Sequence, residues 1–308
     1  MEQIIDAVET SLIERELTAD KLLRTTNKAG NVIYVVTAHN APNTMREIGR
    51  LREIAFRSAG GGTGKACDID EFDLMENPCK QLLVWNPDRR DIVGAYRFIR
   101  GCDVARNDDG TLRIAMGHMF AMSERFVSEF LPRTIELGRS FVSLDYQSTR
   151  AGNKAIFALD NLWDGLGALC VLYPEMKYFF GKMTMYPSYD RDCRDRLLEF
   201  MSIYFPDKDG LIVPIEVASG CNPRNTGFFA GNDFKEDYKL LNAFIRQHGI
   251  NIPPLVNAYM SLSPSMRVFG TAINRHFGDV EETGILIGVD DITEQKKSRH
   301  IDTFVPNK

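Results

Sequence analysis

The chain has 308 residues, of which 44% are hydrophobic and 26% charged, and its net charge at pH 7 is −5. This composition is typical of a folded globular protein with a large core, and the acidic balance argues against a nucleic-acid-binding protein, which is usually basic. Residues 1–23 carry acidic side chains throughout and predict an amphipathic helix instead of a signal peptide. No apolar run reaches the roughly 18 residues that span a bilayer. We therefore expect a cytoplasmic protein that could contact the inner face of the membrane only peripherally.

Cysteine and histidine spacing gives no sign of a metal site. The six cysteines form no CxxC pair and the five histidines are scattered, so the sequence predicts no bound metal or cofactor. Reduced thiols in a cytoplasmic protein are the expected state of the six, which are Cys67, Cys79, Cys102, Cys170, Cys193 and Cys221.

The first predicted elements after the N-terminal helix are a strand and a second helix. Residues 31–39 predict a strand because they are rich in β-branched and aromatic side chains. Residues 43–58 predict a helix from the spacing of their apolar residues. Asn43 or Thr44 could cap this helix, and Glu47 would complete a Thr-x-x-Glu capping box.

The stretch "GGGTGK" at 60–65 raises the question of a nucleotide-binding P-loop. A P-loop has a Ser or Thr after its Lys and runs from a strand into a helix. Here Ala66 follows Lys65, and the stretch leaves a predicted helix, so the sequence argues against a nucleotide site. The wide backbone freedom of glycine instead predicts a mobile lid over 57–67.

The remaining elements follow in the order of a layered α/β domain. The turn at 86–91 predicts that the strands on either side of it form a hairpin. Strands are predicted at 80–86, 91–99, 138–146, 176–185 and 284–290, and helices at 153–173, 189–205 and 233–249.

Several charged residues stand inside or beside the predicted strands. An unpaired buried charge is costly, so such residues need partners. Arg97, for example, should point to the face of its strand opposite Tyr96 and Phe98. Ordinary salt bridges would explain each residue taken singly, but together they form a series in the chain. We take this series as the candidate catalytic residues, which are Arg52, Asp70, Asp73, Arg97, Glu136 and Arg139.

The motifs "LREIAFR", "DIDEFD", "IVGAYRF" and "IELGRSFV" contain this series in order. They resemble motifs of acyl-homoserine-lactone synthases, and more closely those of the N-acyltransferases that begin ornithine-lipid and glycine-lipid synthesis. Some members of this group carry the label hemolysin. The clear resemblance runs from Leu51 to Gly181, and a weaker one covers 252–270.

The resemblance implies the fold of the Gcn5-related acetyltransferases (GNAT), an α/β fold with a splayed mixed β-sheet flanked by helices. We expect a single enlarged acyltransferase domain over 1–308, with N- and C-terminal extensions around a core at about 30–185. The C-terminal extension would cover about 186–308.

In enzymes of this fold an acyl thioester lies between two splayed strands, and its pantetheine arm adds along a strand edge. The family comparison places that edge at Phe141, Val142 and Ser143. An amine then attacks the thioester carbonyl directly, so the resemblance implies no cysteine nucleophile.

The resemblance also implies roles for the candidate catalytic residues. Glu136 is the candidate general base, preferably with a pKa raised by partial burial. Arg139 and Arg97 could hold the carboxylate of an amino-acid acceptor in a bidentate manner. Asp70 and Asp73 could orient these arginines or the ammonium of the acceptor.

The stretch "QSTRAGNKA" at 147–155 bears on the acyl donor. Acetyltransferases of this fold that use coenzyme A carry a Gln/Arg-x-x-Gly-x-Gly/Ala loop whose amides bind pyrophosphate at a helix N-terminus. Gly152 fits that pattern, but Arg150 replaces its first glycine. This favours the acyl-phosphopantetheine of an acyl-carrier protein as donor, with Arg150 and Lys154 as contacts to its single phosphate. A solvated basic start of a helix is the alternative.

The implied function is transfer of a (3-hydroxy)fatty acyl group from acyl-carrier protein to the α-amine of an amino acid, with glycine favoured and ornithine next. Two alternatives stay open: an acyl-homoserine-lactone-type signal synthase, and a non-enzymatic hemolysin-like lipid-binding protein. The segment from residue 185 onward favours the lipid-synthesising branch, because signal synthases are normally shorter. The basic stretch "QKKSRH" at 295–300 could touch anionic lipid headgroups or form a flexible solvated tail.

Overall fold

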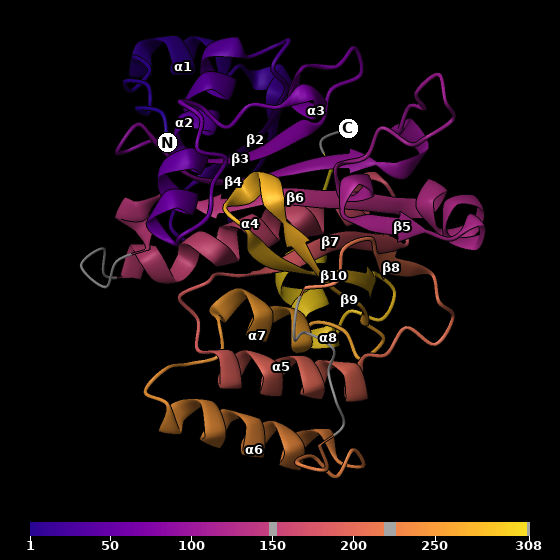
Figure 1. Cartoon of the computed structure of the whole chain (residues 1–308). Helices are drawn as coiled ribbons and strands as arrows, with labels where there is room; N and C mark the ends of the chain where they lie inside the picture. The colour runs from indigo at the N-terminus through magenta and orange to yellow at the C-terminus, as the bar shows by residue number, and fades with distance from the viewer. Residues whose placement is uncertain (148–152, 219–225, 307–308) are drawn as a thin grey trace.

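The computed structural model describes residues 1–147, 153–218 and 226–306 and contains an eight-stranded mixed β-sheet (Figure 1). Neighbouring strands are antiparallel except β6 and β7, which are parallel. In spatial order the strands are β1 (Leu22–Thr25), β2 (Val32–Val36), β3 (Lys80–Asn86), β4 (Asp91–Arg100), β6 (Thr134–Val142), β7 (Tyr178–Met185), β10 (Val280–Gly288) and β9 (Arg267–Asn274). A separate pair is formed by β5 (Phe120–Met122) and β8 (Ile212–Pro214).

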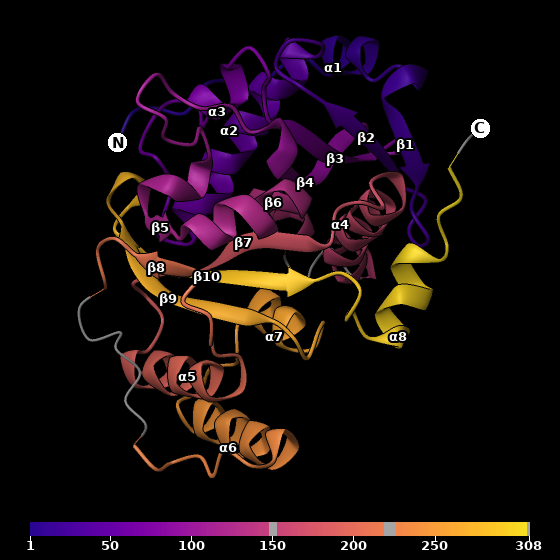
Figure 2. The ribbon, with the colours of Figure 1, turned by 90° about the vertical axis from the view of Figure 1, so that its right-hand side faces the viewer.

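Helices cover both faces of the sheet because alternate strand residues are apolar on each side. Leu83 and Ala95 pack in one hydrophobic cluster with residues of α1 and α2, whereas Leu82 and Tyr96 pack in another with residues of α4 to α7. In Figures 1 and 2, α6 lies outside α5, on the side away from the sheet. The helices are α1 (Thr10–Glu16), α2 (Pro42–Ser58), α3 (Glu71–Leu74), α4 (Asn153–Leu172), α5 (Arg191–Tyr204), α6 (Phe234–Gln247), α7 (Pro254–Met260) and α8 (Glu294–Lys296).

The feature that positions the site is the separation of β6 from β7. The two strands pair only where Thr134–Glu136 lies beside Tyr178–Phe180. Beyond these residues β6 remains paired with β4, and β7 with β10, but the two strands no longer pair with each other. The splayed mixed sheet and flanking helices expected from the sequence are therefore confirmed.

Most predicted elements are present, with changes at their ends. The hairpin of β3 and β4 is confirmed, and its strands lie within one residue of the predicted 80–86 and 91–99. The strand predicted at 138–146 is displaced: it begins at Thr134 and ends at Val142, because residues 144–146 form a 3-10 turn. The prediction of one long N-terminal helix over 1–23 is wrong. The structure has only the short helix α1 there, and strand β1 follows it.

The predicted cap of α2 is also wrong. The helix begins at Pro42, and no side chain of its N-cap residue bonds to the first turn. Glu16, from the end of α1, takes over this role: its carboxylate accepts the N–H groups of Asn43 (3.0 Å) and Thr44 (2.7 Å). Glu47 instead pairs with Arg50 at 2.6 Å. A partner distant in sequence has replaced the local capping box.

The glycine-rich loop, for which the sequence predicts a mobile lid, makes defined contacts with α2. The carboxylate of Glu53, a fully buried residue of α2, accepts the N–H groups of Thr63 (3.1 Å) and Gly64 (2.7 Å). Positive φ values at Gly60 (94°) and Gly62 (98°) explain the need for glycine there. The glycines therefore form a tight turn around a buried acceptor. The loop does leave a helix, as the argument against a P-loop requires.

We expect Glu53→Ala to loosen this loop. The change leaves the N–H groups of Thr63 and Gly64 without their acceptor, which costs about 1–3 kcal/mol per buried unsatisfied group. Hydrogen exchange of residues 60–66 should become faster, and Glu47→Ala, a matched change on the same helix, should leave it unaltered. Unchanged exchange in the Glu53→Ala protein would show that other contacts hold the loop.

The basic stretch at 295–300 is not a flexible tail. It begins in α8 and continues as a helical turn, Lys297–Ile301, that packs against α4. His300 is buried and bonds to Asp164 through Nδ1 at 2.8 Å, and Arg299 pairs with Asp160. Two of its basic side chains are thus engaged by the protein itself.

Candidate active site

Two cavities meet where β6 and β7 separate. The first, of about 490 Å³, is lined mainly by apolar residues of the sheet and of α7, among them Tyr96, Met183 and Leu255. The second, of about 570 Å³, is lined mainly by charged and polar residues and lies on the side of the sheet facing the glycine-rich loop. Residues that line both are Leu137, Gly138, Arg139, Lys182 and Phe277. The sheet is therefore open from one face to the other at this point.

The predicted charged series gathers at the polar cavity. Arg97 points away from Tyr96 and Phe98, as expected, and its Nη1 lies 2.6 Å from Asp70 Oδ1 and 3.3 Å from Asp73 Oδ2. The two carboxylates outweigh the effect of burial and raise the pKa of Arg97. This double ion pair holds Arg97 in β4 through Nη1 alone, and the side chain is only 5% exposed.

Arg52 and Asp73 lie beneath the cavity and support it. Both side chains are fully buried, and Arg52 Nη1 is 3.1 Å from Asp73 Oδ2. Arg52 also donates to Gln81 Oε1 at 2.6 Å, and Gln81 donates to the other oxygen of Asp73 at 2.9 Å. Because neither Arg52 nor Asp73 lines a cavity, they act on the site through Arg97.

Asp70 links the arginines to the short helix α3. Its carboxylate caps α3 by accepting the N–H groups of Phe72 and Asp73. It also lies 3.5 Å from Arg139 Nη2. Burial would raise the pKa of Asp70, but Arg97 and Arg139 outweigh it and lower that pKa to about 2. The group is thus anionic at neutral pH and holds both arginines.

Glu136 is a buried carboxylate on β6 that faces the polar cavity, with 5% of its surface exposed. Its oxygens accept the N–H groups of Met116 (2.8 Å) and Ala115 (3.4 Å), at the start of the 3-10 turn Ala115–His118. Burial raises the pKa of Glu136 although Arg97 and these two donors oppose the rise. A fixed carboxylate with a raised pKa is suited to accept a proton near neutral pH.

Arg139 reaches the polar cavity because β6 bulges there. One residue of β4, Tyr96, lies opposite two residues of β6, Arg139 and Ser140, and Arg139 has a φ of 47°. In a regular strand, residues 136 and 139 would face opposite sides, so the bulge turns both toward the cavity. Arg139 Nε lies 2.9 Å from Asp68 Oδ2, and its guanidinium lies over the ring of Phe277.

Four residues of the site were not predicted from the sequence: Asp68, His118, Lys182 and Glu282. Lys182 lines both cavities, and its Nζ lies 2.9 Å from Glu282 Oε1. Asp68 pairs with Arg139, and His118 lies at the cavity, where desolvation and the cations Lys182 and Arg139 lower its pKa to about 4. The argument that identified Arg97 applies equally to Lys182, a single charge in the apolar stretch "FFGKMTM".

Two residues of the predicted donor-binding edge, Phe141 and Val142, lie on the part of β6 that does not pair with β7, and Ser143 follows the end of the strand. Phe141 packs into the core beside α2, Val142 is half-buried, and Ser143 donates its hydroxyl to the Ile92 carbonyl at 2.6 Å. Any contact of Phe141 with a donor would thus involve its backbone. Arg150 and Gly152 lie outside the described residues, and of Lys154 the structure describes only its place in α4.

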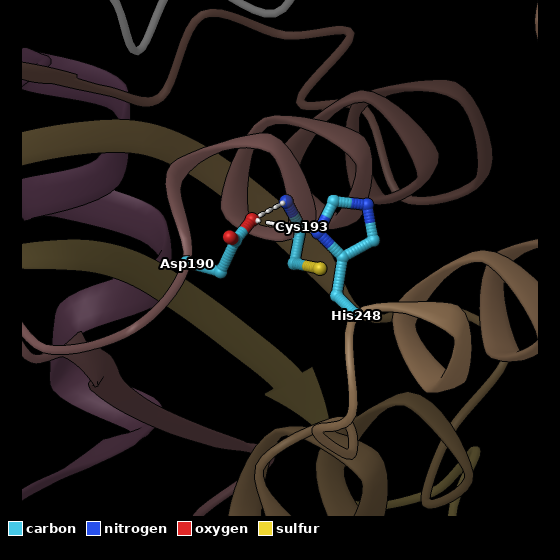
Figure 3. Close-up of side chains that lie close together, drawn as sticks. All are labelled: Asp190, Cys193 and His248. Carbon is cyan, nitrogen blue, oxygen red and sulfur yellow. Dashed lines mark hydrogen bonds and ion pairs between the residues drawn. The ribbon is translucent and has the colours of Figure 1, made fainter.

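Asp190, Cys193 and His248 form a separate cluster whose ligand atoms lie within 4.8 Å of one another (Figure 3). Asp190 Oδ1 caps α5 by accepting the Cys193 N–H at 2.9 Å, and lies 3.5 Å from His248 Nδ1. Burial and Asp190 raise the pKa of Cys193 to about 11, so its thiol is protonated at neutral pH. We interpret the cluster as a cap that ties α5 to the end of α6.

Among the described residues, no helix has both the length and the apolar character needed to cross a bilayer.

Among solved structures, two matches have low sequence identity to this chain. FeeM, an N-acyl amino acid synthase from uncultured soil microbes, has a TM-score of 0.39 and 10% identity, over 89% of this chain and 98% of that one. The acyl-homoserine-lactone synthase LasI has a TM-score of 0.41 and 10% identity, over 91% and 100%.

Sequence comparisons are more informative. Residues 51–155 match the model of an acetyltransferase (GNAT) domain. The glycine N(alpha)-acyltransferase of Bacteroides thetaiotaomicron is 60% identical over 99% of this chain and 91% of its own length. That of Phocaeicola vulgatus is also 60% identical, over 99% and 94%. The chain therefore belongs to the glycine N(alpha)-acyltransferase family and is an acyltransferase of the GNAT type.

Proposed function

We propose that the chain transfers a fatty acyl group from the thioester of an acyl-carrier protein to the α-amine of glycine, as the first step in making a glycine lipid. The observation that carries this proposal is the meeting of an apolar and a polar cavity at the opening between β6 and β7. The apolar cavity suits an acyl chain, and the polar one suits a zwitterionic amino acid. The names of the two 60% identical relatives support glycine as the acceptor.

In the proposed reaction a C–N bond forms and a C–S bond breaks. Glu136 takes one proton from the glycine ammonium, because an amino acid is mostly protonated at neutral pH. The neutral amine attacks the thioester carbonyl, and the second proton of the nitrogen moves to the departing thiolate. Glu136 then releases its proton to water.

The acceptor carboxylate is assigned to Arg139, not to Arg97. The Arg97 side chain is 5% exposed and lines the polar cavity, whereas the Arg139 side chain is 14% exposed and lines both cavities, next to the opening. Arg139 uses Nε for Asp68 and has a more distant contact, 3.5 Å, from Nη2 to Asp70, so part of its guanidinium fork remains for a carboxylate. Asp68 and Asp70 would hold the fork in position.

The pantetheine arm is assigned to the edge of β6 that β7 leaves unpaired after Glu136. Backbone groups along such an edge can pair with the amides of the arm, in the manner of strand addition. An acyl-carrier protein as donor rests on the sequence argument from Arg150. An assay with acyl-coenzyme A in place of the acyl-carrier protein tests this choice of donor.

The proposed function can be tested by following thiol release with a panel of amines and identifying the products by mass spectrometry. Purified protein, 3-hydroxyacyl-loaded acyl-carrier protein and glycine should give N-acylglycine, with ornithine a poorer acceptor. An acyl-homoserine lactone as the main product would favour the signal synthase. The absence of acceptor-dependent thiol release would favour a lipid-binding protein.

Direct transfer predicts that cysteines are dispensable. Cys79 is the cysteine that lines the polar cavity in the described part of the chain, and burial raises its pKa to about 12, so its thiol is protonated and a poor nucleophile. We expect Cys79→Ser to retain turnover within a few-fold, with some loss of stability because the thiol is buried. Detection of an acyl group on any cysteine by intact-mass analysis would contradict direct transfer.

A further inference from the structure

Lys182 is a charged residue at the junction of the cavities to which the resemblance gives no role. Glu136 lies opposite Phe180 on β7, and Lys182 follows two residues later, so both charged side chains are on one face of the sheet, about 7 Å apart along the strand. Lys182 and Arg139 stand on the two strands that separate, β7 and β6. Both residues line both cavities.

Glu282 of β10 keeps the Lys182 ammonium in position. Its carboxylate accepts from Lys182 Nζ (2.9 Å), the Thr184 hydroxyl (2.7 Å) and the Asn274 amide (3.2 Å). Glu282 is 1% exposed, so this anchor is rigid and dry. In the part of the chain that is described, Glu282 is the sole anion in ion-pair contact with Lys182, which leaves two of its three N–H donors for a ligand.

The rest of the polar cavity carries charges of both signs. Asp68, Asp70 and Glu136 all line it and would repel the carboxylate of an amino acid. Arg275 is half exposed and pairs with Glu216 and Asp279. Lys65 and Arg97 also line this cavity. A carboxylate at the opening between β6 and β7 needs a cation with free N–H donors there, and Lys182, which lines both cavities, supplies them.

We propose that Lys182 binds the α-carboxylate of the acceptor, bridging it with Arg139 across the opening between β6 and β7. The inference rests on the proposed acylation of glycine and deepens it. A carboxylate held between the two strands places the α-amine beside both Glu136 and a thioester carbonyl in the opening. Lys182 thus selects acceptors that carry a carboxylate next to the amine.

The test compares glycine with glycinamide, which lacks the carboxylate charge, in wild type and in Lys182→Met. Each kcat/KM is measured at one pH, and the glycine-to-glycinamide ratio of the variant is divided by that of wild type, so the different amine pKa values cancel. We expect the glycine-to-glycinamide ratio to be about 10- to 100-fold lower in the variant than in wild type, which is the usual contribution of a hydrogen bond to a charged group. The loss should appear mainly as a raised KM for glycine, with glycinamide within about 3-fold of wild type.

Two further variants serve as a folding safeguard and as a control. Lys182→Met combined with Glu282→Gln removes both buried charges and retains the Thr184 and Asn274 contacts, so it covers the case in which the single variant fails to fold. Lys177→Met, an exposed lysine of the chain that pairs with Asp290, should behave as wild type.

Other outcomes would overturn the inference in distinct ways. Equal losses with glycine and glycinamide would make Lys182 a structural residue, a base or a group acting on the thioester oxygen. An unchanged KM for glycine would assign the carboxylate to Arg139 without Lys182. A wild-type protein that acylates neither amine would overturn the proposed function itself, and the inference with it.

Discussion

The Glu136→Gln variant is expected to acylate glycine about 10²–10⁴ times more slowly than wild type at neutral pH, which is the usual range for loss of a general base. Glutamine keeps the size of the side chain, and its carbonyl oxygen can still accept the Met116 N–H. Binding of the acyl donor should change little, because the proposed donor site is the open edge of β6 and the apolar cavity.

The pH dependence of turnover gives a second sign of this role. The pKa of Glu136 is raised, so in wild type the carboxyl group is protonated, and inactive as a base, up to a higher pH than an ordinary glutamate. Turnover in wild type should therefore fall as the pH drops through that raised pKa. The Glu136→Gln variant should lack this step, and a higher pH should partly restore its rate because more of the glycine amine is then neutral.

Glu47→Gln is the matched control. Glu47 is also buried and also accepts a backbone N–H, that of Val8 at 3.0 Å, but it lines neither cavity. It should lose some stability and keep its turnover per folded molecule. Near-normal turnover of folded Glu136→Gln at pH 7 would remove Glu136 from the mechanism and leave Asp70 or a chain of water molecules as the base.

Asp73→Ala is expected to cost about 3–5 kcal/mol of the free energy of unfolding, because it leaves a buried cation without its partner. Arg52 is fully buried and would retain only Gln81 and the Asp68 carbonyl. Arg97 would still have Asp70. Urea denaturation followed by circular dichroism measures the loss.

A partly exposed pair provides the comparison for this prediction. Asp103 lies 2.6 Å from Arg100, with both side chains about a quarter exposed, so Asp103→Ala should cost at most about 1 kcal/mol. Similar losses of unfolding free energy in Asp73→Ala and Asp103→Ala would contradict the inference that the buried network supports the site.

The sequence allowed the charged residues to be predicted better than their partners. Arg97 could be identified because it interrupts an apolar strand, and its pairing with Asp70 and Asp73 is as expected. The bulge at Arg139 could not, because nothing in the local pattern distinguishes an αL arginine from a regular strand residue. Without the bulge, Glu136 and Arg139 would face opposite sides of the sheet.

Contacts between distant segments account for the other differences. Glu282 lies 100 residues after Lys182 in the chain, and the two meet because β10 pairs with β7. The glycine-rich loop was expected to move because glycine is flexible, but it is contacted by the buried carboxylate of Glu53, in the preceding helix, and by Arg57 and the N-terminal segment. Local propensity describes the loop sequence, and tertiary contacts determine its structure.

A crystal structure of the protein with bound N-acylglycine would test most directly the claim that the two cavities hold the two halves of one product. We expect the acyl chain in the apolar cavity, the amide at the opening between β6 and β7, and the carboxylate in contact with Arg139 and Lys182. A carboxylate bound outside the polar cavity, or an acyl chain outside the apolar one, would contradict the account.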